Sequence, residues 1–316
     1  SLSVLHNVQN YENSTTMGRP GMNKKIVNSY LMADGSRFTD KAGYETMTFD
    51  QECQNRDPRL AQTIRTPGYT RIGSTKKEAP NLAYTMTGYH LIKYSMTANY
   101  DEYNKSCNDI PLFRTAEVYL NFAEAKAELG TLKQADINKS IKLLRDRVGM
   151  TNLDMELANS KPDPYLMSAA TGYPNVKGAN QGVILEIRRE RTIELAMEGF
   201  RYYDIMRWKE GKLFENDLLG IYVPGPGTYD LDKDGTDDVC FYVGTKPAGN
   251  VPLYLEIGEQ IRLSNGESGY IICHSLITKK WNEDRDYLYP VPISERTLSN
   301  GVITQNPGWN DGLNFN

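Results

Sequence analysis

The sequence RRERTIELAMEGFRYYDIMRWKEGK, residues 188–212, places five Arg and four Glu among Ile, Leu, Met, Phe, Tyr and Trp. Three kinds of structure suit such a mixture: a nucleic-acid-binding face, a catalytic group of carboxylates, or a helix whose charges are satisfied inside the protein. The choice among them determines which classes of function remain for the rest of the chain.

On a helical wheel of 100° per residue, positions 183–198 place apolar side chains on both sides of the helix. This pattern predicts a helix that is buried or nearly buried. Glu190, Glu194 and Glu198 recur at every fourth position within one apolar sector. Because a buried carboxylate without a partner costs several kcal/mol, cations must lie against these three side chains.

The nearest cations in the sequence are Arg191 on the same face, and Arg201 and Arg207 on a following helix. Gly199 suits a left-handed C-cap that would fold this second helix back on the first. In the second helix an aspartate lies three residues from each of the two arginines. We therefore predict an internal ion-pair network that locks a helix hairpin, formed by Glu190, Arg191, Glu194, Glu198, Arg201, Asp204 and Arg207.

The two functional alternatives fit this segment less well. Glycosidase carboxylates normally come from different elements that face each other across a cleft, not from one stripe of a helix. A nucleic-acid-binding helix would not alternate Glu with Arg, and the net charge of −4 provides no basic field for DNA or RNA. We expect no nucleic-acid partner.

The rest of the chain predicts a mainly α-helical fold with long irregular loops and a few short β-strands. Residues 111–130 and 132–149 repeat apolar or small residues every three or four positions. The first segment has Pro111 in its first turn, and the two segments end at Gly130 and Gly149. Two such helices joined by a short turn form an αα-hairpin, whose small residues resemble one tetratricopeptide unit.

Short helices or turns are expected at 19–35 and 54–69, and a short strand at 87–96. We interpret the chain as one domain, residues 1–316. Its segments are irregular loops with a short strand (1–108), the tetratricopeptide-like helix hairpin (109–149), a loop (150–181), the charged helix pair (182–212), a strand and loop insertion (213–280) and a C-terminal strap across the helices (281–316).

EIRRERTIELAMEGFRYYDIMRWKEGKL (186–213) closely resembles the most diagnostic segment of the SusD/RagB family of outer-membrane glycan-uptake lipoproteins. The resemblance covers nearly the whole chain. The further matching segments, in the family's order, are RDPRL (56–60), TGYHLIKY (87–94), FRTAEVYLNFAEAKAELG (113–130), YLYPVPISE (287–295) and QNPGW (305–309).

This resemblance implies a SusD-like α/α fold and non-catalytic capture of oligosaccharides, or of peptides in some branches. It also implies a lipid-anchored protein on the extracellular face of the outer membrane, which covers a SusC-like TonB-dependent transporter. Family members are considerably longer, so the chain looks like their C-terminal portion, and the N-terminal lipid anchor would lie outside it. The residues agree with the absence of catalysis, because the sequence has no nucleophile motif, metal triad or phosphate loop.

Sugar recognition needs flat aromatic faces together with polar side chains. Tyr is unusually frequent in this chain, with 21 residues against 8 Phe and 3 Trp. All three Trp lie in segments that carry the family pattern, which favours structural roles for them. The candidate platforms for a glycan are therefore tyrosines in loops, namely Tyr69, Tyr84, Tyr100, Tyr103 and Tyr173, although for any single one an ordinary surface or half-buried tyrosine is the favoured interpretation.

The segment YDLDKDGTDDV (229–239) resembles a calcium loop. Ca²⁺ takes six to eight oxygen ligands, and alternating carboxylates can converge on it. Position 12, usually a bidentate Glu, is Phe241 here, so an acidic β-turn is the alternative interpretation. No cofactor is required by the sequence, and a structural Ca²⁺ is the one that it suggests, with the candidate ligands Asp230, Asp232, Asp234, Thr236 and Asp238.

Two other classes of function remain as alternatives to glycan capture. The abundance of Asp and Glu would suit a glycoside hydrolase, and the helix hairpin would suit an adaptor that binds only another protein. Neither alternative has a motif of its own in this sequence. The residues do not identify the glycan or peptide.

Overall fold

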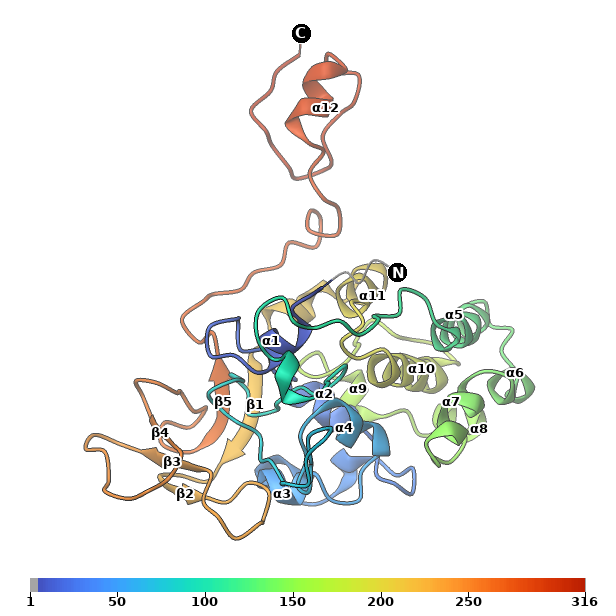
Figure 1. Ribbon diagram of the computed structural model, residues 1–316. Coiled ribbons are helices and arrows are strands. Elements are labelled where there is room, and N and C mark those ends of the chain that lie inside the picture. The colour runs from blue at the N-terminus through green and yellow to red at the C-terminus, as the bar shows by residue number, and fades with distance from the viewer. Residues whose placement is uncertain (1–4, 316) are drawn as a thin grey trace.

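The computed structural model describes residues 5–315, and its regular structure is mainly helical (Figure 1), as predicted. No helix among these residues is both long and apolar enough to cross a membrane. The α-helices are α1 (Val8–Glu12), α2 (Lys24–Ser29), α3 (Phe49–Glu52), α4 (Pro58–Thr63), α5 (Thr115–Glu128), α6 (Gln134–Asn138), α7 (Ile141–Arg147), α8 (Met155–Ser160), α9 (Pro164–Met167), α10 (Gln181–Glu194), α11 (Arg201–Arg207) and α12 (Ile293–Leu298).

Short 3₁₀ helices punctuate the loops: η1 (Phe38–Asp40), η2 (Tyr44–Thr46), η3 (Ala98–Tyr100) and η4 (Gly211–Glu215). The strands all fall in the segment where a strand and loop insertion was predicted. They form two small sheets, one in which β1 (Leu218–Val223) pairs antiparallel with β5 (Gly269–Cys273), and one in which β3 (Val239–Tyr242) lies between antiparallel β2 (Gly227–Tyr229) and parallel β4 (Leu253–Glu256).

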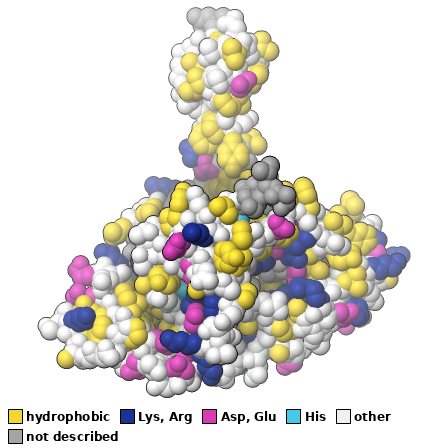
Figure 2. Space-filling view, in the orientation of Figure 1, with side chains coloured by type: hydrophobic (Ala, Val, Ile, Leu, Met, Phe, Trp, Pro, Cys, Tyr) yellow, Lys and Arg dark blue, Asp and Glu magenta, His cyan; other side chains and the backbone are white. Residues whose placement is uncertain are grey.

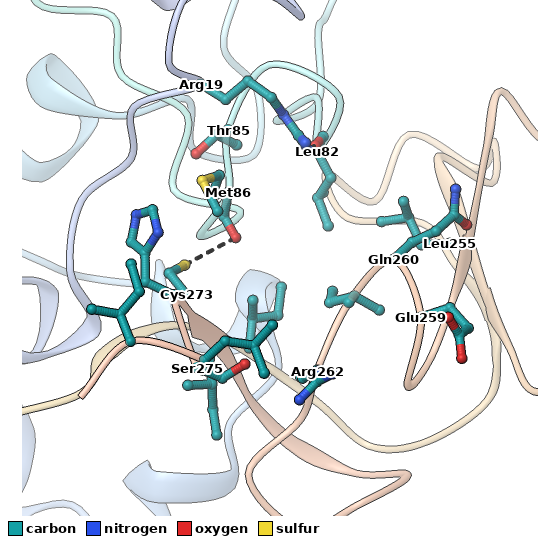
Figure 3. A pocket seen from close by; sticks show the side chains of 16 residues that line it. Arg19, Leu82, Thr85, Met86, Leu255, Glu259, Gln260, Arg262, Cys273 and Ser275 are labelled. Atoms are coloured by element: carbon teal, nitrogen blue, oxygen red, sulfur yellow. Dashed lines mark hydrogen bonds between the residues drawn. The ribbon is translucent and has the colours of Figure 1, made fainter.

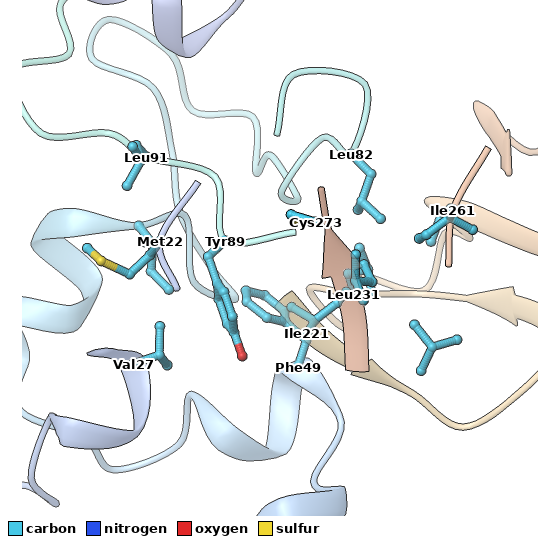
Figure 4. Packing of buried hydrophobic residues seen from close by; sticks show 14 of the residues in the cluster. Met22, Val27, Phe49, Leu82, Tyr89, Leu91, Ile221, Leu231, Ile261 and Cys273 are labelled. Atoms are coloured by element: carbon cyan, nitrogen blue, oxygen red, sulfur yellow. The ribbon is translucent and has the colours of Figure 1, made fainter. Parts of the chain in front are cut away.

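Two hydrophobic clusters form the interior. The strand-side cluster packs β-strand residues such as Ile221 against Phe49 of α3 and Tyr89 of a loop (Figure 4). The helix-side cluster packs α5, α7 and α10 together, with Leu120 and Ile141 fully buried. The helices α5 and α7 therefore lie in a different cluster from the strands, whereas α2, α3 and α4 pack with the strands.

Helix α10 contributes to both clusters, because Ile187 belongs to the helix-side cluster and Ile193 to the strand-side cluster. It packs against α2, α5, α7 and α8. Its start approaches α8 so closely that a Cβ on Gly182 would lie 1.8 Å from the carbonyl oxygen of Ala158. The side chain of Asn159 accepts a 2.8 Å hydrogen bond from an N–H of the first turn, one of the donors that a helix start leaves unpaired.

The predicted helix hairpin is only partly regular. The helix expected from Pro111 begins at Thr115, although Gly130 does follow its end with a left-handed φ of 68°. The second helix is broken into α6 and α7 around Ser140, whose hydroxyl donates to the carbonyl of Asp136 at 2.7 Å. This side-chain bond satisfies a backbone carbonyl where the helix is interrupted. Such side-chain bonds compete with the hydrogen bonds of a helix, and the periodicity of apolar residues does not reveal them.

Other predicted boundaries also differ. The expected strand at 87–96 is a single bridge between Leu91 and Ile64, so that prediction was wrong. The loop at 150–181 contains α8 and α9. Helix α10 ends at Glu194, and the turn that follows includes Met197 and Gly199, both with a positive φ.

The C-terminal segment does not lie across the helices as expected. It leaves the body near β5 and ends in an arm that carries α12 (Figure 1). Hydrophobic side chains gather on the surface of this arm (Figure 2), and Leu298 and Val302 are more than four-fifths exposed. Extended, Pro-rich sequence predicted a strap, but its direction depends on contacts that the sequence pattern does not specify.

Three carboxylates of the charged segment, Glu190, Glu194 and Glu198, form what we call the glutamate ladder. Each is buried or nearly buried, and each accepts from cations of distant segments. Glu190 pairs with Arg59 of α4 at 2.6 Å and with Arg145 of α7 at 2.8 Å. Glu194 pairs with Arg59 at 3.0 Å, with Arg114 at 2.7 Å and with Arg147 at 2.9 Å. Glu198 pairs with Lys93 at 2.6 Å and with Arg114 at 2.7 Å.

The cations expected from the sequence have other partners. Arg191 pairs with Asp204 at 2.7 Å, and Arg207 bonds Asp204 and Glu124. Arg201 pairs with no carboxylate and donates to the hydroxyls of Tyr173 and Thr192 at 2.7 and 3.1 Å. The expected pairing was wrong because the ladder faces α4 and α7, whereas Arg191 lies on the side of α10 that faces α5 and α11.

We predict that Glu190→Gln lowers the free energy of unfolding by about 3–5 kcal/mol, because it leaves two buried guanidinium groups without their shared carboxylate. Denaturant titration followed by circular dichroism measures this change. Glu156→Gln on α8 is the matched control, since its side chain is exposed. Equal stability of the two variants would contradict the ladder's role.

The ladder also predicts a pH dependence. Burial opposes ionisation of Glu190, but Arg59 and Arg145 outweigh it and lower its pKa from 4.5 to about 2. A carboxyl whose pKa falls on folding contributes stability that is present above pH 4.5 and is lost as the pH falls through about 2. The thermal midpoint of the wild type should therefore fall more steeply across this range than that of Glu190→Gln. If the thermal midpoints of the two proteins fell in parallel with pH, the result would contradict the lowered pKa of Glu190.

Candidate functional site

A cavity of about 630 Å³, here called the polar cleft, lies between loops that are far apart in the sequence. One wall comes from residues 65–84 and 98–101, and the other from the acidic loop 232–239. The residues on which its chemistry depends are Arg65, Arg71, Tyr84, Asp101, Asp232 and Asp238.

The first wall carries two buried arginines. Arg65 donates to the side chain of Asn13 at 2.8 Å and pairs with Glu78 at 3.0 Å. Arg71 donates to Gln9 at 2.8 Å and pairs with Asp101. Each guanidinium is thus held by two partners, which gives this wall rigid, directional donors without a large excess of charge.

Unpaired polar atoms lie behind this wall. Glu12 is buried, and burial outweighs its bond from Ser95 and the nearby arginines, so its pKa rises to about 8 and the carboxyl is neutral at pH 7. Among the described residues, no partner bonds Oε1 of Glu12, Nε2 of Gln9 or Nε of Arg65. Buried polar groups normally find a partner, so these three atoms are exceptions, and Gln9 and Glu12 lie behind the wall rather than in the lining of the cleft.

The second wall is the acidic loop. Carboxylate oxygens of Asp230, Asp232 and Asp238 lie within 4.8 Å of one another. Asp234 uses its carboxylate to accept from the N–H of Thr236 at 2.8 Å and is not part of this group. Phe241, at the position of the missing glutamate, is buried in β3. The loop therefore brings three of its four predicted aspartates together.

Burial raises the pKa values in this group, and repulsion among its carboxylates adds to the effect. Burial, together with the charges of Asp232, Asp230 and Asp234, raises the pKa of Asp238 to about 6 despite a bond from the N–H of Leu231. The pKa of Asp232 is also raised, first by burial and then by Asp234. A bound cation would relieve both effects, and hard oxygen ligands are those that Ca²⁺ prefers.

Of the five candidate tyrosines, Tyr84 lines the polar cleft, with its ring edge-on to His90 at 6.0 Å between centroids. Tyr69 lies under the guanidinium of Arg65, 5.4 Å from it, and is half-buried outside the lining. Tyr100 and Tyr103 flank the lining residue Asp101 without lining the cleft themselves.

Tyr173 is unsuited to a platform for a glycan. Only 3% of the residue is exposed, and its ring packs edge-on against Trp208 in the helix-side cluster at 5.3 Å. Its hydroxyl bonds Thr192 and Arg201. A Pro- and Gly-rich segment predicted an exposed loop, but the loop turns this side chain inward.

Sequence reasoning missed the buried arginines of the first wall. Arg65 and Arg71 begin and end the segment RTPGYTR, in which only the tyrosine was considered. The two flanking arginines are the signal that could have indicated a polar site. Their partners Gln9 and Asn13 lie more than 50 residues away, and no local pattern connects them.

A second cavity, of about 430 Å³, lies between the loop around Met86 and the segment from β4 to β5 (Figure 3). Its lining combines aliphatic residues with polar ones in about equal number and includes no Tyr, Trp or Phe. The thiol of Cys273 donates to the carbonyl of Met86 at 3.3 Å, and burial raises the pKa of this thiol to about 11. This cavity offers no flat face for a sugar ring.

Solved structures share the fold of this chain. A SusD-like carbohydrate-binding protein from Bacteroides fragilis is 23% identical, with a TM-score of 0.56 over 87% of this chain and 47% of its own. Another SusD-like protein of B. fragilis is 20% identical, with a TM-score of 0.54 over 97% of this chain and 51% of its own. The chain therefore spans about half the length of these proteins.

A search of the curated proteins finds none that matches the chain. The model of the SusD family matches residues 5–309, which include the glutamate ladder, both walls of the polar cleft and most of the C-terminal arm. The match covers almost the whole sequence, in agreement with the resemblance carried by the charged segment, and the chain belongs to the SusD family.

Proposed function

We propose that the protein binds oligosaccharides without cleaving them and that the polar cleft is the binding site. The observation that carries this proposal is the convergence of Tyr84, two buried arginines and an acidic loop around one cavity of about 630 Å³. Such a volume suits a ligand of several hundred daltons, and paired charged groups suit the donors and acceptors of sugar hydroxyls. The carbohydrate-binding relative from B. fragilis supports this proposal.

Family membership supports a wider role. We propose that the whole protein is anchored by lipid on the outer face of the outer membrane and delivers its ligand to a SusC-like TonB-dependent transporter. Peptide capture is the alternative within the same family. These roles belong to a longer protein than this chain, which covers about half of its solved relatives.

The glycoside hydrolase alternative is less well supported. Hydrolysis needs an acid and a carboxylate placed on opposite sides of the scissile bond. Asp232 and Asp238, the two clustered aspartates that line the polar cleft, belong to one loop, and Asp101 on the opposite wall is paired with Arg71. This arrangement favours binding over catalysis.

Tyr84→Ala should weaken oligosaccharide binding at least tenfold, or about 1.4 kcal/mol, because it removes the aromatic face of the cleft. Calorimetric titration with malto-, xylo- and manno-oligosaccharides identifies a ligand and measures the loss. Tyr103→Ala is the matched control, since Tyr103 is 64% exposed and lies outside the cleft. Release of reducing ends from any of these glycans would instead favour the hydrolase.

We also propose that the acidic loop binds Ca²⁺ through Asp230, Asp232 and Asp238. Calorimetric titration with Ca²⁺ should give saturable heat, which Asp232→Asn abolishes and Asp237→Asn, an exposed neighbour outside the cluster, retains. Because the pKa of Asp238 is about 6, protons should compete with the metal and weaken its binding below that pH. Absence of heat in the wild type would remove the metal site.

A further inference from the structure

A third cavity, of about 310 Å³, opens beside the glutamate ladder and shares no lining residue with the polar cleft. We call it the arginine pocket. Its volume suits a single sugar ring or a short peptide end rather than an oligosaccharide. The lining residues on which its chemistry depends are Arg59, Lys93, Tyr94, Arg114, Arg147 and Glu194.

The ion pairs around this pocket carry an excess of positive charge. Among the described residues, the bonded group contains the cations Arg59, Lys93, Arg114, Arg145 and Arg147, and the carboxylates Asp57, Glu190, Glu194 and Glu198. Five cations thus face four carboxylates. This unbalanced positive charge favours an anion at the pocket, and because its most exposed cation is Arg147, added salt should screen the attraction.

Arg147 is the cation that remains available to a ligand. Its side chain is 52% exposed, and one nitrogen, Nη2, donates to both oxygens of Glu194 at 3.0 and 2.9 Å. No described residue accepts from its Nε or Nη1. By contrast, Arg114 uses Nε, Nη1 and Nη2 on Glu194 and Glu198. Arg147 therefore keeps two donors, Nε and Nη1, for a ligand, and because they lie on different edges of the guanidinium, each can donate singly to an anion.

Tyr94 gives the pocket an aromatic side. It has a left-handed φ of 71°, an unusual conformation for a bulky residue. The ammonium of Lys93 lies 5.8 Å from the centre of the Tyr94 ring. The side chain of Asn108 donates to the backbone carbonyl of Tyr94 at 3.4 Å. Backbone strain of this kind persists where the surroundings hold the residue, and it concentrates at ligand sites.

We infer that the arginine pocket binds the carboxylate of a small polar ligand, either an acidic sugar residue or the C-terminus of a peptide. Arg147 receives the carboxylate, and the ring of Tyr94 flanks the rest of the ligand. The arginine pocket is separate from the polar cleft, which we propose as the oligosaccharide site, so either site can exist without the other.

Wild-type protein tests the chemistry directly. Calorimetric titration with D-glucuronate and with N-acetyl-alanyl-alanine separates the two sources of carboxylate, and D-glucose and the dipeptide amide are their uncharged counterparts. Saturable binding of either acid, weakened by added NaCl and absent with its counterpart, is expected. Equal responses to the charged and uncharged probes would overturn the inference.

Arg147→Gln locates the site. It should weaken binding of the acid at least tenfold while the thermal midpoint changes little, because Arg59 and Arg114 still hold Glu194. Lys142→Gln on the same helix removes an equal charge outside the pocket and is the matched control. Equal losses in both variants would mean a general charge effect and would overturn the assignment.

Two further comparisons keep the sites distinguishable. If Arg147→Gln unfolds, Tyr94→Leu replaces it, and unchanged binding of the acid in that variant would overturn the role of the pocket. Arg147→Gln should leave binding of neutral oligosaccharides unchanged, and Tyr84→Ala should leave binding of glucuronate unchanged. Loss of both ligands in both variants would overturn the existence of two separate sites.

Discussion

The burial of the carboxylates of Glu190 and Glu194 on α10, and of Glu198 in the turn after it, is the constraint on which the rest of the structure depends. An ionised carboxylate in the interior is tolerated only with close, well-oriented cations. The glutamate ladder obtains them from α4, from the segment before α5, from α7 and from the loop at Lys93. Two of these segments, the loop at Lys93 and the residues before α5, have no regular structure of their own, so their ion pairs to the ladder help to hold them in place.

The same attachment positions the arginine pocket and the polar cleft. The chain leaves α4 at Thr63, which lines the arginine pocket, and two residues later Arg65 lines the polar cleft. It returns at Lys93 and Tyr94 to the arginine pocket and reaches the cleft again at Asp101. One irregular segment thus lies between the arginine pocket and the polar cleft. In the cleft, the arginines of the first wall are paired with carboxylates, and the second wall is acidic. Anchoring to a rigid helix gives such loops the fixed geometry that binding sites need.

The sequence pattern anticipates a clustering of aspartates where the geometry is local, although whether this cluster binds a metal stays a prediction. Alternating aspartates bring Asp230 and Asp232 together because a tight turn places them on one side, and Asp238 joins them across the β2–β3 hairpin. Sequence reasoning failed where exposure depends on distant packing. Tyr84 and Tyr173 both follow small residues in loops, yet Tyr84 lines the cleft whereas Tyr173 is covered by Trp208, the residue that follows α11.

By itself, the sequence determined that α10 is buried, that its carboxylates need cations, and which family the chain resembles, because helix periodicity and charge are properties of neighbouring residues. Only the tertiary structure decided which cations pair with the glutamate ladder, in which direction the C-terminal arm extends and which aromatic ring lines a cavity. Each of these depends on side chains separated by tens of residues, such as Arg59 and Glu190, and such pairs are chosen by how the whole chain packs.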